Sequence, residues 1–301
     1  MKQFGITVLL ATCGWLVCQA CSPGDGSFRA AAVAVKITPQ VEGFEDIDGD
    51  GHHDADEPFD DLDGDGQWDP TWMGGYQSER PAVGVMHDLW ARILVLEGAN
   101  GLRACIVSAD WVGLFYDQAK EIERRARERG VRLDLFVFSS THSHQSPETM
   151  GLWGPPGRTG RDAEYFERSA EAIASGIEEA VDRLEPATML AGQSRTHGLT
   201  RDSRLPEAID ERVTVLQFIR QTDSSPIATA VHWPNHPEVF HEDNQLITPD
   251  FPHAIVGEQR WPDSVGIYWQ GTVGGLLTPL GVEVADEHGN PTEENTWEKA
   301  E

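Results

Sequence analysis

Cysteine is scarce in this chain, which limits the classes of protein to which it can belong. Cys13, Cys18 and Cys21 lie within the first 21 residues, and only Cys105 lies in the body of the chain. A disulfide-stabilised scaffold is therefore excluded. Cys105 stands in the strand-like run 103–108, where a buried small apolar side chain is a better interpretation than a catalytic thiol.

Long apolar runs are also scarce, and the only long one begins the chain. Lys2 is followed by an apolar run over residues 6–17 and by small residues before Cys21. This is the pattern of a secretory signal peptide over residues 1–20. Gln19–Ser22 also fits a bacterial lipoprotein lipidated at Cys21, with simple cleavage and release as the alternative. Both predict an exported protein, either periplasmic, secreted or held at the outer membrane, where a lipid anchor would bring it to the membrane surface.

Basic residues are missing from one segment. Between Glu42 and Asp69 there are 13 acidic residues and no Lys or Arg, in a chain whose formal net charge is -27. This acidity argues against nucleic acid as a partner. A bare segment of this charge would repel itself and remain disordered, so the alternatives are a solvated acidic linker and a set of cation ligands.

The spacing of the acids favours cation ligands. Residues 46–57 match the calcium-loop template Asp-x-Asp-x-Asp-Gly-x5-Glu. Residues 61–72 repeat it with Trp72 in place of the final Glu, so that carboxylate must come from elsewhere. We predict a calcium-binding insertion over residues 42–72 that braces a loop. Its candidate ligands are Asp46, Asp48, Asp50, His52, Asp54, Glu57, Asp61, Asp63, Asp65, Gln67 and Asp69.

Strands and helices alternate in the rest of the chain. Short apolar runs predict strands at 30–37, 89–97, 102–109, 133–138, 188–191, 212–219, 227–232 and 265–269. Amphipathic spacing predicts helices at 117–129 and 163–184, with a shorter helix at 250–258 and a capped helix beginning within 290–301. The alternation predicts an α/β domain with mixed β-sheets over residues 21–301.

Two histidine runs follow predicted strands. Thr141–Pro147 reads Thr-His-Ser-His-Gln-Ser-Pro, and Trp233–Glu238 reads Trp-Pro-Asn-His-Pro-Glu. Strands hold such imidazoles still, while loops leave a coordination position open for water. Zinc lowers the pKa of its bound water to about 7. The runs therefore predict a metal-activated hydrolase, with loop histidines bonded to backbone as the alternative.

At these residues the chain resembles a known family. Thr141–Pro147 resembles the Thr-His-Thr-His-Ser-Gly-Pro signature of the neutral/alkaline, non-lysosomal ceramidases. Residues 231–252 resemble that family's second histidine segment, in which a His-Pro precedes a Ser-Ala-Asp-Tyr-Pro-like run, here Ile247–Pro252. Residues 32–39 and 88–97 also agree with the family pattern, so the resemblance extends, with gaps, from about residue 30 to residue 279.

The resemblance implies a fold and a set of roles. The sheets would be flanked by helices. His142 and His236 would be zinc ligands, and His144 would line the site and polarise the substrate carbonyl or the water. The family's substrate-binding arginine falls on Arg201 or Arg204, and Arg204 is taken as the candidate.

The chain also departs from the family pattern. The segment that carries an active-site serine in the family corresponds to residues 274–279, where an aspartate is lost and Thr278 replaces the serine. The resemblance makes the Thr278 hydroxyl the candidate catalytic group at this position. A Glu and a Tyr that complete the family's zinc site further downstream have no counterpart before Glu301. We therefore expect an N-terminal part of a longer protein. Glu238 and His241 are candidates to fix a ligand imidazole, with solvated loop residues as the alternative.

Together these patterns predict zinc-dependent hydrolysis of an N-acyl amide bond, with a ceramide-like lipid amide as substrate and with Zn²⁺ and Ca²⁺ as cofactors. Two alternatives remain open. One is a truncated or inactive homologue that keeps the fold. The other is a calcium-dependent cell-surface binding module, in which the acidic loops bind the partner and the histidines are structural.

Overall fold

The computed structural model describes residues 28–257, 260–273, 277–286 and 288–301. The predicted signal peptide and the candidate lipidation residue Cys21 lie outside the described residues. No helix within these ranges is long and apolar enough to cross a bilayer.

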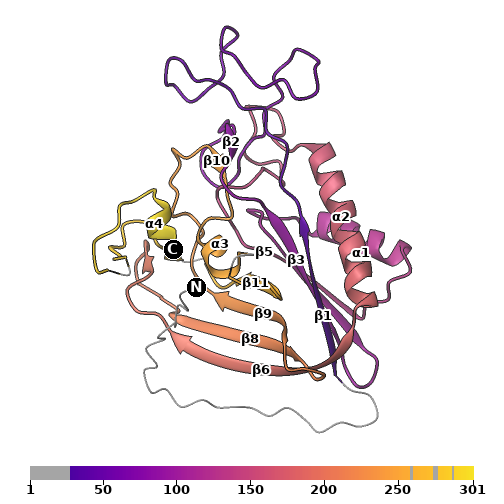
Figure 1. Cartoon of the computed structure of the whole chain (residues 1–301). Helices are drawn as coiled ribbons and strands as arrows, with labels where there is room; N and C mark the ends of the chain where they lie inside the picture. Colours follow the sequence, from indigo (N-terminus) through magenta and orange to yellow (C-terminus); the bar gives the residue numbers. More distant parts are fainter. Residues whose placement is uncertain (1–27, 258–259, 274–276, 287) are drawn as a thin grey trace, which may run out of the picture.

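The main element is an eight-stranded mixed sheet in the order β11-β9-β8-β6-β1-β3-β4-β5 (Figure 1). Its strands are β1 (Arg29–Lys36), β3 (Trp90–Glu97), β4 (Arg103–Ala109), β5 (Leu135–Ser140), β6 (Glu185–Arg195), β8 (Arg212–Arg220), β9 (Pro226–Trp233) and β11 (Val265–Gln270). Pairing is antiparallel except between β4 and β5 and between β9 and β11.

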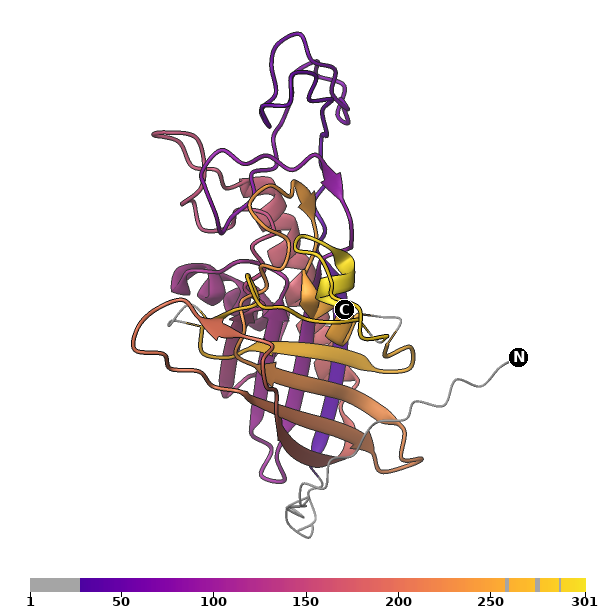
Figure 2. The same cartoon turned by 90° about the vertical axis from the view of Figure 1, so that its left-hand side faces the viewer.

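The sheet consists of two halves that pack against each other. Only two residue pairs, Arg29 with Pro186 and Ala30 with Glu185, join β1 to β6. Beyond this narrow junction β11 crosses over β4, where the Ser108 hydroxyl donates a hydrogen bond to the Tyr268 carbonyl. Figure 2 shows the two sets of strands running in different directions. A buried cluster that includes Leu94 and Phe218 fills the space between them.

Two helices cover the outer face of the half formed by β1, β3, β4 and β5. They are α1 (Tyr116–Glu128) and α2 (Ala163–Asp182) (Figure 1). Asp162 caps α2 by accepting a hydrogen bond from the backbone N–H of Tyr165. The apolar face of α2 packs into the largest buried cluster of the molecule with its residues Phe166, Ala170, Ile173 and Ile177. The domain therefore has three layers, one of helices and two of strands, as expected for an α/β fold.

Shorter elements complete the chain. They are β2 (Gly84–Val85), β7 (Arg201–Asp202), β10 (Leu246–Ile247), β12 (Leu277–Thr278), α3 (Phe251–Val256) and α4 (Trp297–Ala300). β10 pairs with β2, and β12 pairs with β7. Thr296 caps α4, since its hydroxyl accepts a hydrogen bond from the N–H of Lys299. This agrees with the predicted capped helix in residues 290–301.

The predicted α/β class is confirmed, and the strand boundaries differ most in β6. The prediction for 188–191 covers the middle of an 11-residue strand. The residues added at its end, Gly192–Arg195, are small or polar and carry no apolar alternation. Their strand conformation comes from pairing with β8, a tertiary effect that local sequence does not encode. Cys105 is fully buried in β4, as an apolar core residue would be.

The packing of α2 on the sheet generates a prediction at Gly176. A Cβ there would lie 2.6 Å from Ile93 Cδ1 and 2.8 Å from Val35 Cγ1. We expect Gly176→Val to lower the free energy of unfolding by about 2 kcal/mol, because extra atoms in a close-packed core force neighbours apart. Urea titration measures this. Ser175→Val, on the exposed face of the same helix, should change stability little, and equal effects of the two substitutions would contradict the packing account.

Candidate metal centre

The two histidine loops meet at one place. β5 leads into His142 and His144, and β9 leads into His236. The loops are joined directly, since the backbone N–H of His144 donates a hydrogen bond of 3.1 Å to the carbonyl of Pro237. His142 has a positive φ of 69°, which is uncommon for a residue other than glycine and turns the chain sharply after β5.

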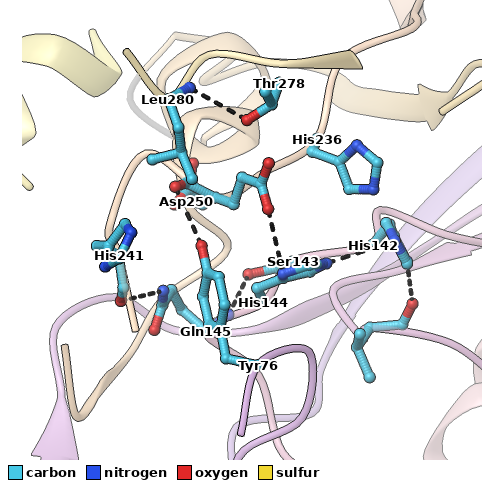
Figure 3. A network of polar contacts seen from close by, with 12 residues as sticks. Tyr76, His142, Ser143, His144, Gln145, His236, His241, Asp250, Thr278 and Leu280 are labelled. Carbon is cyan, nitrogen blue, oxygen red and sulfur yellow. Dashed lines mark hydrogen bonds and ion pairs between the residues drawn. The ribbon is translucent and has the colours of Figure 1, made fainter. Parts of the chain in front are cut away.

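The three imidazoles converge. Ring centroids are 5.0 Å apart for His142 and His144, 5.0 Å for His142 and His236, and 5.5 Å for His144 and His236. One nitrogen from each ring lies within 4.8 Å of the others. Figure 3 shows the rings from the two loops facing a common point. The structure thus brings together the histidines that the sequence singled out.

Hydrogen bonds set the tautomer of two of these rings. His142 Nδ1 lies 2.6 Å from the Val112 carbonyl oxygen, and His236 Nδ1 lies 2.7 Å from the Leu277 carbonyl oxygen. A carbonyl only accepts, so each Nδ1 carries the proton. Burial lowers the pKa of both imidazoles, which keeps them neutral. Each Nε2 therefore presents a lone pair to the centre, as a metal ligand does.

Glu238 lies behind His144. Its Oε2 is 3.4 Å from His144 Nδ1, an atom that has no hydrogen bond among the described residues. Burial raises the pKa of Glu238, and a hydrogen bond with Thr278 opposes this rise. The structure therefore places Glu238 against the histidine group, where the sequence left it as a candidate. His241 contacts the ring of Tyr76, with centroids 5.9 Å apart.

Thr278 and the two candidate arginines occupy different environments. Thr278 is buried beside Glu238, and its hydroxyl accepts a hydrogen bond from the N–H of Leu280. Arg201 pairs with Thr278 across β7 and β12 and favours the charged form of Glu238. Arg204 lies in an exposed turn after β7. The structure therefore places Arg201 closer to the histidine group than Arg204, and the role of Arg204 stays a prediction.

Two buried residues hold the loops, and sequence reasoning assigned a role to neither. The Arg80 guanidinium donates hydrogen bonds to the carbonyls of Gly74, His144 and Asn244 and to Gln145 Oε1. The Gln145 amide in turn donates to the carbonyls of Phe240 and His241. Arg80 thus ties the first histidine loop to the second. Nothing in its sequence context distinguishes it from a surface arginine.

Asp250 holds the second loop from the other side. Its carboxylate, which is fully buried, accepts hydrogen bonds from the N–H groups of Val239, Phe240 and Phe251. Burial raises the pKa of Asp250 to about 7, and its φ of 64° is again unusual for a residue other than glycine. The sequence contained a signal here, because Asp250 is the aspartate of the Ser-Ala-Asp-Tyr-Pro-like run.

The acidic insertion forms two loops of the same design, which project at the top of Figure 1. In each loop the first aspartate, Asp46 or Asp61, accepts hydrogen bonds from the backbone N–H groups three and five residues on. Glycines at both positions have positive φ. Carboxylates gather into three groups, Asp46 with Asp48 and Glu57, Asp61 with Asp63 and Glu42, and Asp63 with Asp65 and Asp69.

Glu42 supplies the carboxylate that the second loop lacked in sequence. In the first loop, Glu57 accepts hydrogen bonds from the N–H groups of loop positions 2 and 9, at 2.7 and 2.9 Å. In the second loop, Glu42 accepts from the same two positions, at 2.9 and 2.8 Å. It does so from the N-terminal side of both loops. The calcium-loop template expects this carboxylate at the last position of the loop, so it does not identify Glu42, which precedes the loop in the chain.

Comparison with known proteins identifies the fold. No protein-family model and no curated protein sequence matches the chain. Among solved structures, the neutral ceramidase from Pseudomonas aeruginosa matches with a TM-score of 0.69 and 21% identity, over 92% of this chain and 43% of that one. A ceramidase complexed with C2 matches with a TM-score of 0.67 and 21% identity, over 92% and 42%.

The chain therefore has the fold of part of a neutral ceramidase, as the motifs predicted. It spans less than half the length of the ceramidases it matches. The donor set of the centre also fits zinc, the metal that the family resemblance implies. Neutral imidazole nitrogen is a preferred zinc donor, and the Nδ1–H groups of His142 and His236 already donate to carbonyls, which leaves each Nε2 to offer its lone pair.

The close approach of Gly75 to His144 generates a prediction. Gly75 has a φ of +105°, and a Cβ there would lie 2.5 Å from His144 Cγ and 2.9 Å from His144 Cα. We expect Gly75→Ala to displace the His144 imidazole and to lower the free energy of unfolding by about 2 kcal/mol, as measured by urea titration.

Gly101→Ala is the matched control for that substitution. Gly101 also has a positive φ, of +76°, but nothing lies within 4 Å of its virtual Cβ. It carries a left-handed backbone strain of about 1 kcal/mol without the collision, and should therefore lower stability by only that amount. Equal stability of the two variants would show that a Cβ at Gly75 does not collide with His144.

Proposed function

We propose that this chain carries the histidine centre of a zinc-dependent hydrolase that cleaves the N-acyl amide bond of a ceramide-like lipid. The observation that carries the proposal is the convergence of His142, His144 and His236 from two loops, with the Nδ1 atoms of His142 and His236 bonded to carbonyls. The ceramidase fold supports the reaction class, and the complex named for the second ceramidase supports a lipid amide as substrate.

The residues of the chain have separate tasks in this proposal. His142 and His236 would hold the ion. When bound, zinc supplies a water whose pKa is lowered to about 7 for attack on the acyl carbonyl. Glu238, which lies behind His144, would be held in place by its hydrogen bond with Thr278. A nearby cation would stabilise the oxyanion that develops on the carbonyl oxygen, with Arg204 as the sequence candidate and Arg201 favoured by its place beside Thr278.

The proposal includes where the protein acts. An exported protein, lipidated at Cys21 or released, would meet lipid amides at or near a membrane surface.

A calcium-dependent binding module is the alternative function. It would need the acidic loops but would not need three imidazoles facing one point. The convergence of the histidines therefore favours the enzyme.

Removal of a ligand imidazole tests the proposed centre. We expect His142→Ala or His236→Ala to abolish most zinc binding, because each removes a donor whose partner on Nδ1 has already oriented it. Hydrolysis of a fluorescent N-acyl amide should fall at least a hundredfold below that of the unsubstituted protein. Zinc content after dialysis, measured by atomic spectroscopy, and the hydrolysis rate are the two readouts.

His197→Ala is the control for both readouts. His197 is 75% exposed in its side chain and pairs with Glu211, far along the chain from either histidine loop. This variant should keep zinc and activity. If all three variants retained zinc alike, the proposed metal centre would be wrong.

We also propose that the two acidic loops bind one Ca²⁺ each and so rigidify the insertion. The proposal is supported by the shared loop design and by the equivalent contacts of Glu57 and Glu42. Burial, and after it the charges of Asp65 and Glu42, raises the pKa of Asp69. A bound cation would offset this mutual repulsion of the carboxylates. Phe44, His53 and Trp68 pack between the loops with ring centroids 4.5 to 5.6 Å apart.

Calcium removal should lower the melting temperature. An ion bound only by the native state stabilises it by about 2.7 kcal/mol at a concentration 100 times its Kd. Glu42→Gln should reduce the calorimetric stoichiometry from two ions to one, while Glu45→Gln, at an exposed position three residues away, should leave it at two. A melting temperature indifferent to chelator, or two ions in Glu42→Gln, would contradict the proposal.

A further inference from the structure

We propose that Glu148 positions a loop, residues 149–153, whose apolar side chains bind an alkyl chain of the lipid amide beside the histidine centre. The inference rests on the proposed function and deepens it, because it names residues that recognise the substrate away from the reacting bond. Glu148 itself touches neither the substrate nor the metal. It is a positioning residue that acts through the loop.

Glu148 is a buried carboxylate with an unusual set of partners. The residue is 1% exposed. Its two oxygens accept hydrogen bonds from four consecutive backbone N–H groups, those of Met150, Gly151, Leu152 and Trp153. Hydrogen bonds to an ionised acceptor are roughly twice as strong as those between neutral groups. One side chain therefore fixes the backbone of almost the whole loop.

The loop depends on this acceptor because it has no regular secondary structure, so its N–H groups have no helix or sheet partner. Other contacts fix only its two ends. The Thr149 hydroxyl donates a hydrogen bond of 2.7 Å to the carbonyl of Gly113. At the other end the Trp153 carbonyl accepts a hydrogen bond of 3.0 Å from the N–H of Glu79. Glu148 therefore sets the conformation of the residues between these ends.

One side of the loop lies beside the residues that orient His142. A Cβ on Gly113 would lie 2.6 Å from Met150 Sδ, so the Met150 side chain packs directly on this glycine. Gly113 follows Val112, whose carbonyl holds the Nδ1–H group of His142. Met150 is thus separated from the histidine centre by a single layer of chain.

The other side of the loop lies beside the segment that packs on His144. A Cβ on Gly74 would lie 3.1 Å from Cε3 of the Trp153 ring. The next residue, Gly75, approaches His144 so closely that a Cβ there would lie 2.5 Å from its Cγ. The loop therefore borders both histidines of the first run.

The side chains of the loop suit an alkyl chain. Leu152 is 57% exposed, and Met150 and Trp153 are half-buried. Residues 149–153 carry no charged side chain, and ligand sites are lined mainly by apolar and aromatic side chains. A loop that is already fixed also loses little conformational entropy when it binds, which favours affinity. The part of a lipid amide that matches such a surface is its alkyl chain.

Binding of substrate analogues to the zinc-loaded protein tests the inference without turnover. N-Methyl-N′-alkyl ureas keep the carbonyl and N–H of an amide and resist hydrolysis. Calorimetry gives the Kd for alkyl chains of two to eight carbons. A fully buried CH₂ strengthens binding about fourfold, and a chain lying along an open loop is only partly buried. We therefore expect the wild-type Kd to fall about twofold for each added carbon.

Two substitutions should flatten this dependence on chain length. Glu148→Gln leaves one acceptor oxygen and turns an NH₂ group toward the loop N–H groups, and Leu152→Ser removes an exposed apolar side chain. Each should at least halve the gain per carbon and change the Kd of the two-carbon urea less than twofold. A general loss of structure would instead weaken all the ureas alike. Leu102→Ser is the matched control, since Leu102 is 55% exposed in the turn between β3 and β4.

The outcomes separate this inference from the proposed function. A wild-type Kd independent of chain length, or equal gains per carbon in Leu152→Ser and Leu102→Ser, would overturn the alkyl site and leave hydrolysis at the histidine centre standing. A zinc-loaded protein that neither binds any urea nor hydrolyses any N-acyl amide would overturn both. Leu152→Ser decides the question if Glu148→Gln fails to fold, because Leu152 is exposed.

Discussion

The site depends on the hydrogen bond that joins the two histidine loops, from the backbone N–H of His144 to the carbonyl of Pro237. This bond forms because the two half-sheets pack face to face, which brings the end of β5 beside the end of β9. About 90 residues of chain separate the loops, so their alignment depends on the whole domain. Any shift of one half-sheet over the other would move His236 away from His142 and His144.

Buried polar side chains make that alignment rigid. Arg80 donates to carbonyls on both loops and to Gln145, although burial lowers its pKa to about 10. Asp250 holds the N–H groups of Val239 and Phe240 while it is itself fully buried. Such groups cost free energy to bury and are tolerated when hydrogen-bonded. The free-energy cost of burying Arg80 and Asp250 is consistent with a site that needs the histidines of the two loops held in a fixed geometry.

The sequence predicted the elements of the domain and the histidines of the site, because both are local patterns. Amphipathic spacing located α2, and motif order located His142 and His236. The roles of Arg80 and Glu42 could not be predicted from the sequence, because each hydrogen-bonds to residues distant in the chain and neither belongs to a recognisable motif. The place of Arg201 beside Thr278 depends on β7 pairing with β12, two strands of two residues each, which are too short to predict from periodicity.

The central claim is that one metal ion binds where the two histidine loops meet. Anomalous diffraction at the zinc absorption edge, from crystals of the protein grown with zinc, tests it most directly. The account predicts a single strong peak at bonding distance from the Nε2 atoms of His142 and His236. Crystals that show no peak there, with the imidazoles in the arrangement described, would contradict it.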